Sequence, residues 1–249
     1  MSDTTPDPGA ESSGPATARV PARLAALLVI RIIFGVTVIA AILFLAAGTT
    51  DWPGAWAYLA LVASSLTGFA VLVAGKDRAL LEERMRADRN TDIKRWDRLL
   101  VIVIGMVLPP ATWLVAGLDR RYGWSPGPGF VLGAVALLIA LLGSALVIWA
   151  AASNTFFSAI VRIQKDRGHT VVTGGPYAAV RHPGYVGTIA VNLAAPVVLG
   201  SVWALAICAV IVVLVVIRTA LEDRTLQREL DGYADYARRV RWRLLPGVW

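Results

Sequence analysis

Long apolar segments alternate with short polar ones along most of this chain. Each apolar segment has roughly the 20 residues that a helix needs to cross a hydrocarbon core about 30 Å thick. Backbone groups in that core find no water, so we expect helices, and the two-residue alternation of barrel strands is absent. The predicted spans are residues 24–47, 55–74, 99–118 and 130–152, followed by a longer stretch at 186–217.

The stretch 186–217 is too long for a single span. It divides at Leu199-Gly200-Ser201, which predicts a tight hairpin of a fifth and a sixth helix. Pro109 and Pro110 lie midway along the third span, where we expect them to kink the helix or end it early. The expected fold class is an all-α integral membrane protein with about six transmembrane helices.

The polar segments divide the chain into three regions. Residues 1–20 are rich in Ser, Thr, Pro and Gly and predict a disordered tail. Residues 21–152 form a four-helix transmembrane region. Residues 153–249 begin with a polar, glycine-rich segment at 153–185, continue through the hairpin and end in a charged amphipathic helix.

Composition agrees with a membrane protein, since 57% of residues are hydrophobic and 16% are charged, with a mean hydropathy of +0.63. The net charge of +7 does not indicate a nucleic-acid partner, because the Lys and Arg residues lie between apolar segments. They concentrate at 76–98, at 153–185 and near the C-terminus, so the positive-inside rule places both termini in the cytoplasm. High Ala and Arg content suggests a bacterial genome, hence the inner membrane and its lipids. A single cysteine, Cys208, excludes a disulfide within the chain and a Cys-based zinc site, and we expect no metal.

Two segments carry candidate chemistry. Both histidines of the chain lie at 168–185, together with two tyrosines, an arginine and several glycines. An ordinary connecting loop is the alternative interpretation. Arg218 and Glu222 lie four residues apart at the end of the last span and therefore share a helix face. They form either a salt-bridged helix end or a polar pair at the mouth of an intramembrane cavity.

These two segments resemble the isoprenylcysteine carboxyl methyltransferase family. Its pattern is Gly-His-x-Leu-Val-x-x-Gly-x-Tyr-x-x-x-Arg-His-Pro-x-Tyr, followed by Arg-x-x-x-Glu-Glu. The chain departs from the pattern at Val171 and at Asp223. The resemblance covers about residues 150–249. The matching residues are Gly168, His169, Val172, Gly175, Tyr177, Arg181, His182, Pro183, Tyr185, Arg218 and Glu222.

The resemblance implies that S-adenosylmethionine binds in a cytoplasmic pocket formed by 153–185 and the C-terminal helix, within a catalytic region at 153–249. It implies catalytic roles for Arg218, which would hold an acceptor carboxylate, and for Glu222, which would hold Arg218 or act as a base. The acceptor would be a lipophilic small molecule or lipid carrying a carboxylate, thiol, amine or hydroxyl. The implied cofactor-binding residues are His169, Val172, Gly175, Tyr177, Arg181, His182, Pro183 and Tyr185.

Two other functions stay open at this point. One is an NADPH-dependent membrane reductase of the steroid-reductase type, and the other is a non-enzymatic membrane protein. The charged loop 76–98 is either a solvated helical cap or part of a lid over the cofactor, in which case Trp96 and Asp97 are the residues to test.

Overall fold

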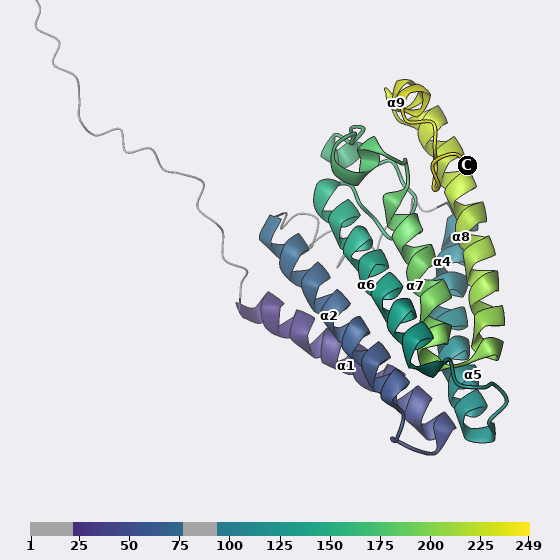
Figure 1. The fold of residues 1–249 in the computed structure, drawn as a ribbon. Coiled ribbons are helices and arrows are strands. Elements are labelled where there is room, and N and C mark those ends of the chain that lie inside the picture. The colour runs from purple at the N-terminus through teal and green to yellow at the C-terminus, as the bar shows by residue number, and fades with distance from the viewer. Residues whose placement is uncertain (1–21, 77–93) are drawn as a thin grey trace, which may run out of the picture.

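The structure, a computed structural model, describes residues 22–76 and 94–249, and the regular secondary structure among them is helical, with no strand. The predicted tail 1–20 and most of the charged loop 76–98 lie outside the described residues. Figure 1 shows a bundle of roughly antiparallel helices, with α9 beside one end of it. The helices are α1 (Ala22–Ala47), α2 (Pro53–Lys76), α4 (Arg95–Ile102), η2 (Val103–Val107), α5 (Leu108–Tyr122), α6 (Gly129–Ser153), η3 (Lys165–Arg167), η4 (Gly175–Ala178), α7 (Pro183–Leu199), α8 (Val202–Glu229) and α9 (Tyr233–Arg239).

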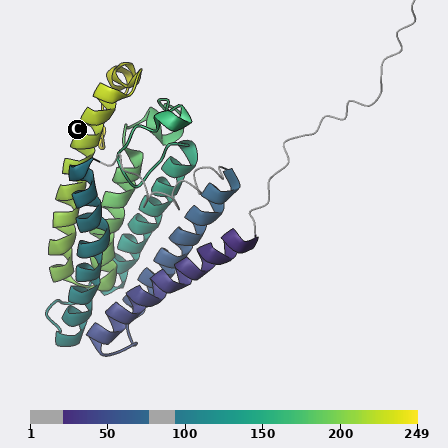
Figure 2. The ribbon, with the colours of Figure 1, turned by 180° about the vertical axis from the view of Figure 1, so that it is seen from behind.

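Five helical stretches within the described residues are long and apolar enough to cross a membrane: 25–47, 53–72, 95–122, 129–153 and 202–229. The fifth predicted span is the shorter α7, an apolar helix of 17 residues. The chain is therefore an all-helical integral membrane protein, as the pattern of apolar segments predicted. Figure 2 shows the opposite face of the bundle, where α4 and α5 lie beside α8.

The third span passes through its two prolines rather than ending there. Pro109 and Pro110 lack the N–H groups that would bond to carbonyls one turn earlier. The residues just before them, Val103–Val107, form a π-helical turn that joins α4 to α5. A π-turn is a common response to a disturbed ladder of helix hydrogen bonds.

The hairpin between α7 and α8 turns at the predicted place. Gly200 adopts a left-handed conformation with φ of 73°, which ends α7 at no steric cost. Ser201 then caps α8, because its hydroxyl accepts a hydrogen bond from the amide of Ala204 at 3.0 Å. The same hydroxyl donates a hydrogen bond to Oδ2 of buried Asp119 at 2.5 Å, which links the turn to α5.

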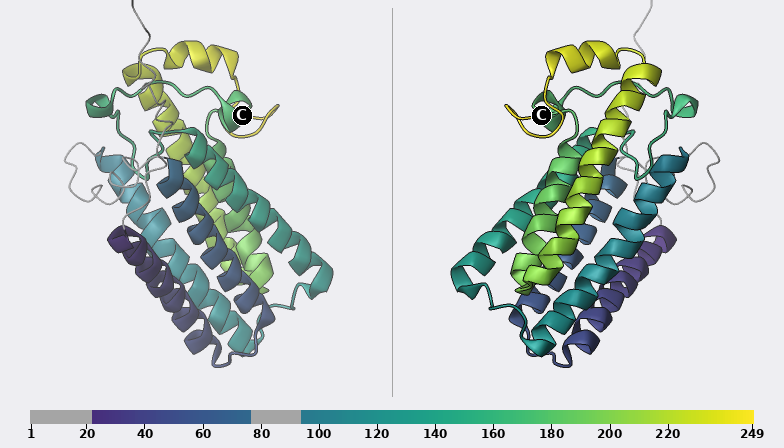
Figure 3. Two further views of the ribbon diagram at one scale, coloured as in Figure 1. Left: turned by 90° about the vertical axis from the view of Figure 1, so that its left-hand side faces the viewer. Right: turned by 90° about the vertical axis from the view of Figure 1, so that its right-hand side faces the viewer.

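Close helix packing at the centre of the bundle depends on glycine. A Cβ atom on Gly187 would lie 2.4 Å from the carbonyl oxygen of Gly143, so α6 and α7 touch backbone to backbone. Without a hydrophobic force between helices in lipid, such small residues are what lets helices associate closely. This contact fixes the start of α7, and Figure 3 shows the loop 154–182 and α9 gathered at that end of the bundle.

Candidate functional site

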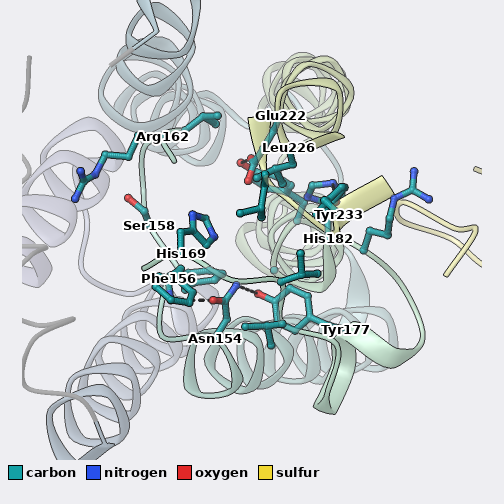
Figure 4. Close-up of a pocket in the computed structure, with 18 of the residues that line it drawn as sticks. Asn154, Phe156, Ser158, Arg162, His169, Tyr177, His182, Glu222, Leu226 and Tyr233 are labelled. Atoms are coloured by element: carbon teal, nitrogen blue, oxygen red, sulfur yellow. Dashed lines mark hydrogen bonds between the residues drawn. The ribbon is translucent and has the colours of Figure 1, made fainter. Parts of the chain in front are cut away.

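A cavity of about 330 Å³ lies at the end of the bundle where α7 begins. This volume falls within the range of roughly 300–1,000 Å³ that is usual for small-molecule sites. Its walls come from the loop after α6, from the facing sides of α7 and α8, and from α9, and Figure 4 shows the polar side chains around it. Phe69 of α2 and Val147 of α6 line its apolar part.

The loop after α6 is held in shape by a buried amide side chain, that of Gln164. Its Nε2 donates to the carbonyl oxygen of Phe156 at 2.8 Å. The backbone of Gln164 also pairs with His169, since its amide donates to Nδ1 at 3.3 Å and its carbonyl accepts from the His169 amide at 3.2 Å. The His169 ring consequently stacks on Phe156, with 4.4 Å between centroids, at the cavity wall.

Burial lowers the pKa of His169, and the positive charges of Arg162 and Arg167 lower it further. A neutral imidazole is therefore favoured near neutral pH. This agrees with the acceptor role of Nδ1, which leaves Nε2 as the protonated nitrogen and a hydrogen-bond donor. His169 thus offers a donor edge and an aromatic face to the cavity.

Asp223 of α8 is the polar centre beneath the cavity and is fully buried. Arg181 binds it with two parallel hydrogen bonds, from Nε at 2.8 Å and from Nη2 at 2.9 Å. Further contacts surround the carboxylate: Arg243 Nε at 2.8 Å, Gln227 Nε2 at 2.7 Å, the Tyr233 hydroxyl at 3.1 Å and His182 Nε2 at 3.3 Å. Two guanidinium groups thus offset the charge of one buried carboxylate, as burial in a low dielectric requires.

The C-terminal segment docks against the residues that precede α7. The amides of Arg181 and His182 donate to the carbonyls of Trp242 at 2.9 Å and Arg243 at 3.0 Å. Nη1 of Arg181 donates to two more carbonyls, those of residues 240 and 241, at 2.9 and 2.8 Å. All three guanidinium nitrogens of Arg181 are therefore bonded within the protein. Although burial alone lowers the pKa of Arg181, its bonds to Asp223 raise it overall, so this cation is permanent.

Tyrosine hydroxyls complete this part of the wall. Tyr177 accepts a hydrogen bond from Asn154 Nδ2 at 3.3 Å, and its carbonyl accepts from the Tyr236 hydroxyl at 2.7 Å. Burial raises the pKa of Tyr177 and of Tyr233, and raises that of Tyr236 to about 12. These phenols are therefore neutral at physiological pH and act as hydrogen-bonding groups rather than as bases.

The deeper end of the cavity lies between α4, α7 and α8. Arg218 Nε donates to Oδ1 of fully buried Asp97 at 2.8 Å, and Nη2 donates to the carbonyl of Ala159 at 2.6 Å. Glu222 accepts a hydrogen bond from the Tyr185 hydroxyl at 2.5 Å. Glu222 was expected either to hold Arg218 or to act as a base. In the structure the carboxylate that binds Arg218 comes from Asp97, 121 residues earlier, and a role of Glu222 as a base stays a prediction.

Most residues singled out from the sequence converge on this one cavity. Two of them do not line it. Gly175 adopts a positive φ of 60° and packs against Ser153, while Pro183 opens α7 as its first residue. Their implied contacts with a cofactor stay predictions, as do the roles of all the others. Those that line the cavity are His169, Val172, Tyr177, Arg181, His182, Tyr185, Arg218 and Glu222.

The part of the chain that carries this cavity was compared with known proteins. Residues 134–228 match the model of the isoprenylcysteine carboxyl methyltransferase (ICMT) family. The matched residues begin inside α6 and include α7 and nearly all of α8, the two helices that form facing walls of the cavity.

Curated relatives agree with the match to the ICMT family model. Protein-S-isoprenylcysteine O-methyltransferase of Rattus norvegicus is 35% identical over 119 residues, which are 44% of this chain and 39% of that protein. The enzyme of the same name from Mus musculus is 35% identical over 119 residues, 44% of this chain and 40% of that protein. The chain thus spans about two fifths of the length of the curated relatives it matches.

One solved structure is also similar, that of the eukaryotic intramembrane Ras methyltransferase ICMT without a monobody. Its TM-score is 0.47 at 18% identity, over 90% of this chain and 87% of that one.

Sequence reasoning overlooked two acids that organise the site. Asp223 was noted only as a departure from the ICMT pattern, yet five side chains bind it, and Arg181 does so through two nitrogens. Asp97 was named as a residue to test in a lid, but it is buried and also accepts from the amide of Val161 at 2.6 Å. The available signal was an acid within the first turn of a membrane-spanning helix, where an unpaired charge is costly.

Proposed function

We propose that this chain is an S-adenosylmethionine-dependent membrane methyltransferase that acts on a lipophilic acceptor. The observation that carries the proposal is the convergence of two separate motif segments, 168–185 and 218–222, on one cavity within the ICMT-matching region. The cavity joins a polar wall to an apolar end, as a polar cofactor and a lipophilic acceptor together require. The curated relatives named above are methyltransferases, which supports the same reaction.

The side chains present fit such a cofactor. The stacked rings of Phe156 and His169 offer an aromatic surface for adenine. Nε2–H of His169 and the Asn154–Tyr177 pair offer hydrogen bonds to hydroxyl or ring-nitrogen groups. Glu222 supplies a negative charge for a cationic sulfur. When bound, S-adenosylmethionine supplies a methyl group on that cationic sulfur.

The protein's part in such a transfer is alignment and exclusion of water. In-line displacement at carbon gains most from holding the reacting groups in a near-attack geometry. Arg218 is fixed at two nitrogens, and Glu222 is fixed by Tyr185, so the polar groups of the deep end are preorganised. Side chains such as those of Phe69 and Val147 line the apolar part of the cavity and exclude water there, which favours a reaction in which charge is dispersed.

We place the cavity on the cytoplasmic side of a bacterial inner membrane, with both termini on that side. Support comes from the distribution of basic residues. The opposite end of the described bundle has Arg120 and Arg121 beside the turn after α5. The cavity end has many more: Arg162, Lys165, Arg167, Arg181, Arg224, Arg228, Arg238, Arg239, Arg241 and Arg243. The division into a transmembrane region, 21–152, and a catalytic region, 153–249, belongs to the same proposal.

The test is calorimetric binding of S-adenosylmethionine and S-adenosylhomocysteine to the purified full-length protein in mild detergent. We expect binding by the wild type and at least about tenfold weaker binding by His169→Ala, because stacking and a hydrogen bond are both lost. Tyr122→Ala is the matched control, since it removes a ring stacked on Trp124 at the opposite end of the bundle. A folded wild type that binds neither compound would contradict the proposal.

A further inference from the structure

Two separate segments of the loop after α6 line the cavity, residues 156–162 and residues 169–172. The chain between them makes a turn that includes η3 and Gln164. The Gln164 side chain is buried, with 1% of its surface exposed, and it is not part of the cavity lining. Any effect of Gln164 on a bound ligand must therefore act through the residues that it holds.

Every polar atom of Gln164 has a hydrogen-bond partner, as burial of an amide group requires. Nε2 of its side chain donates to the carbonyl oxygen of Phe156 at 2.8 Å, and Oε1 accepts from Nη1 of Arg167 at 2.7 Å. Its backbone amide donates to Nδ1 of His169 at 3.3 Å, and its carbonyl accepts from the amides of Arg167 at 2.9 Å and His169 at 3.2 Å. Gln164 thus connects the first residue of one lining segment to the first residue of the other.

The turn brings His169 back onto Phe156. Gly168 has a φ of 61°, a left-handed conformation that glycine adopts without steric cost, and it reverses the chain just before His169. The Phe156 ring stacks on His169, and the guanidinium carbon of Arg167 lies over the same ring, 5.7 Å from its centroid. Figure 4 shows Phe156 and His169 next to each other at the cavity wall. Gln164 is therefore bonded to all three members of this stack.

The bond to His169 also fixes which ring nitrogen carries the proton. Because Nδ1 accepts from the Gln164 amide, the proton of the neutral ring resides on Nε2, where it is available to a ligand. A loop without these bonds would have to order both rings when the ligand binds, and that ordering lowers affinity. A role limited to stability, by contrast, would leave ligand affinity unchanged in every folded variant.

We propose that Gln164 is a positioning residue for the cofactor, which aligns the Phe156 ring and the Nε2–H donor of His169 before the ligand binds. The inference rests on the proposed binding of S-adenosylmethionine and adds the residue that keeps its site preformed. Gln164 acts through Phe156 and His169 rather than by touching the ligand. Its replacement should therefore weaken cofactor binding in protein that remains folded.

The test is calorimetric titration of the full-length protein in mild detergent with S-adenosylmethionine and with S-adenosylhomocysteine. We expect Gln164→Ala to bind both at least about fivefold more weakly than the wild type. In the double variant with His169→Ala, the combined loss should be at least about twofold smaller than the product of the two single losses, because Gln164 acts partly through His169. Asn192→Ala is the matched control: it removes an amide that donates to the carbonyl of Thr188 at 2.9 Å within α7, and it should leave binding unchanged.

Nitrogen-15 NMR of histidine-labelled protein reads the His169 ring directly. The chain has two histidines, so the spectrum of His169→Ala assigns the signals. We expect His169 of the wild type to carry its proton on Nε2 alone near neutral pH. Gln164→Ala should show a mixture of the two tautomers, whereas Asn192→Ala should keep the wild-type pattern.

Three results would each overturn the inference alone: binding by folded Gln164→Ala within about twofold of the wild type, losses that multiply in full in the double variant, or an unchanged His169 tautomer. If Gln164→Ala does not fold, Gln164→Glu takes its place in the same experiments. Its carboxylate keeps an acceptor for Arg167 but has no donor for the carbonyl of Phe156. Failure of the wild type to bind S-adenosylmethionine would overturn the proposed function and this inference with it.

Discussion

Arg181 and Asp223 form a bidentate ion pair, with Nε to Oδ1 at 2.8 Å and Nη2 to Oδ2 at 2.9 Å, and both side chains are almost completely buried. The pair joins the segment before α7 to the last turns of α8, across 42 residues of sequence. Because Arg181 also binds the C-terminal segment, one guanidinium connects three parts of the site. Its contribution is to position the wall of the cavity.

Removing this guanidinium is expected to destabilise the protein strongly. Arg181→Gln leaves a buried carboxylate short of two charged hydrogen bonds, so we expect the free energy of unfolding to fall by about 3 kcal/mol. The control is Arg238→Gln, which breaks the exposed ion pair with Asp235 and should cost less than about 1 kcal/mol. Thermal unfolding in detergent measures both. Similar shifts for the two variants would contradict the role given to Arg181.

The Tyr185–Glu222 hydrogen bond is expected to affect the rate of transfer more than cofactor affinity. Tyr185→Phe keeps the ring beneath Arg218 but removes the donor that holds Glu222 at 2.5 Å. A hydrogen bond to a charged group is worth about 1.5–3 kcal/mol, so kcat should fall roughly 10- to 100-fold. The dissociation constant of S-adenosylmethionine should change little. A loss of affinity with kcat unchanged would show that Glu222 contributes to cofactor binding alone and not to the transfer.

The lowered pKa of His169 predicts a dependence of stability on pH. In the unfolded chain this histidine gains its proton near pH 6.5, whereas in the folded protein it gains one only at lower pH. The unfolded state therefore binds more protons between these two values, and stability falls as the pH decreases through that window. Melting temperatures measured from pH 7.5 to 5 should fall more steeply for the wild type than for His169→Gln. Parallel curves would contradict the lowered pKa.

The contact between Gly143 and Gly187 predicts sensitivity to a single methyl group. A Cβ on residue 187 would lie 2.4 Å from a backbone oxygen and 2.8 Å from Val147, which lines the cavity. Gly187→Ala should therefore separate α6 from α7 and destabilise the protein by about 1–3 kcal/mol. Gly35→Ala on α1, where no atom lies within 4 Å of the new Cβ, is the matched control. Equal melting temperatures for the two variants would show that the helices adjust freely.

The sequence predicted what depends on local patterns, and missed what depends on distant pairing. Apolar segment lengths predicted the spans, and Gly200 with Ser201 predicted the hairpin, because a left-handed residue and a helix cap are local requirements. Arg218 and Glu222 share a helix face as their spacing predicted, yet they bind different partners. Which acid pairs with Arg218 depends on how α4 packs against α8, and no local pattern encodes that packing.

The unequal lengths of α7 and α8 have a consequence for how an acceptor arrives. α7 ends and α8 begins at the same tight turn, but α8 has 28 residues and α7 has 17. The eleven additional residues extend about 16 Å beyond the start of α7, and the recess beside them is the cavity described above, which Glu222 and Leu226 help to line. An acceptor that reaches this recess sideways keeps its alkyl chain in lipid and avoids an extraction cost of about 0.8 kcal/mol per methylene group. Turnover would then follow the mole fraction of acceptor in the bilayer rather than its concentration in water.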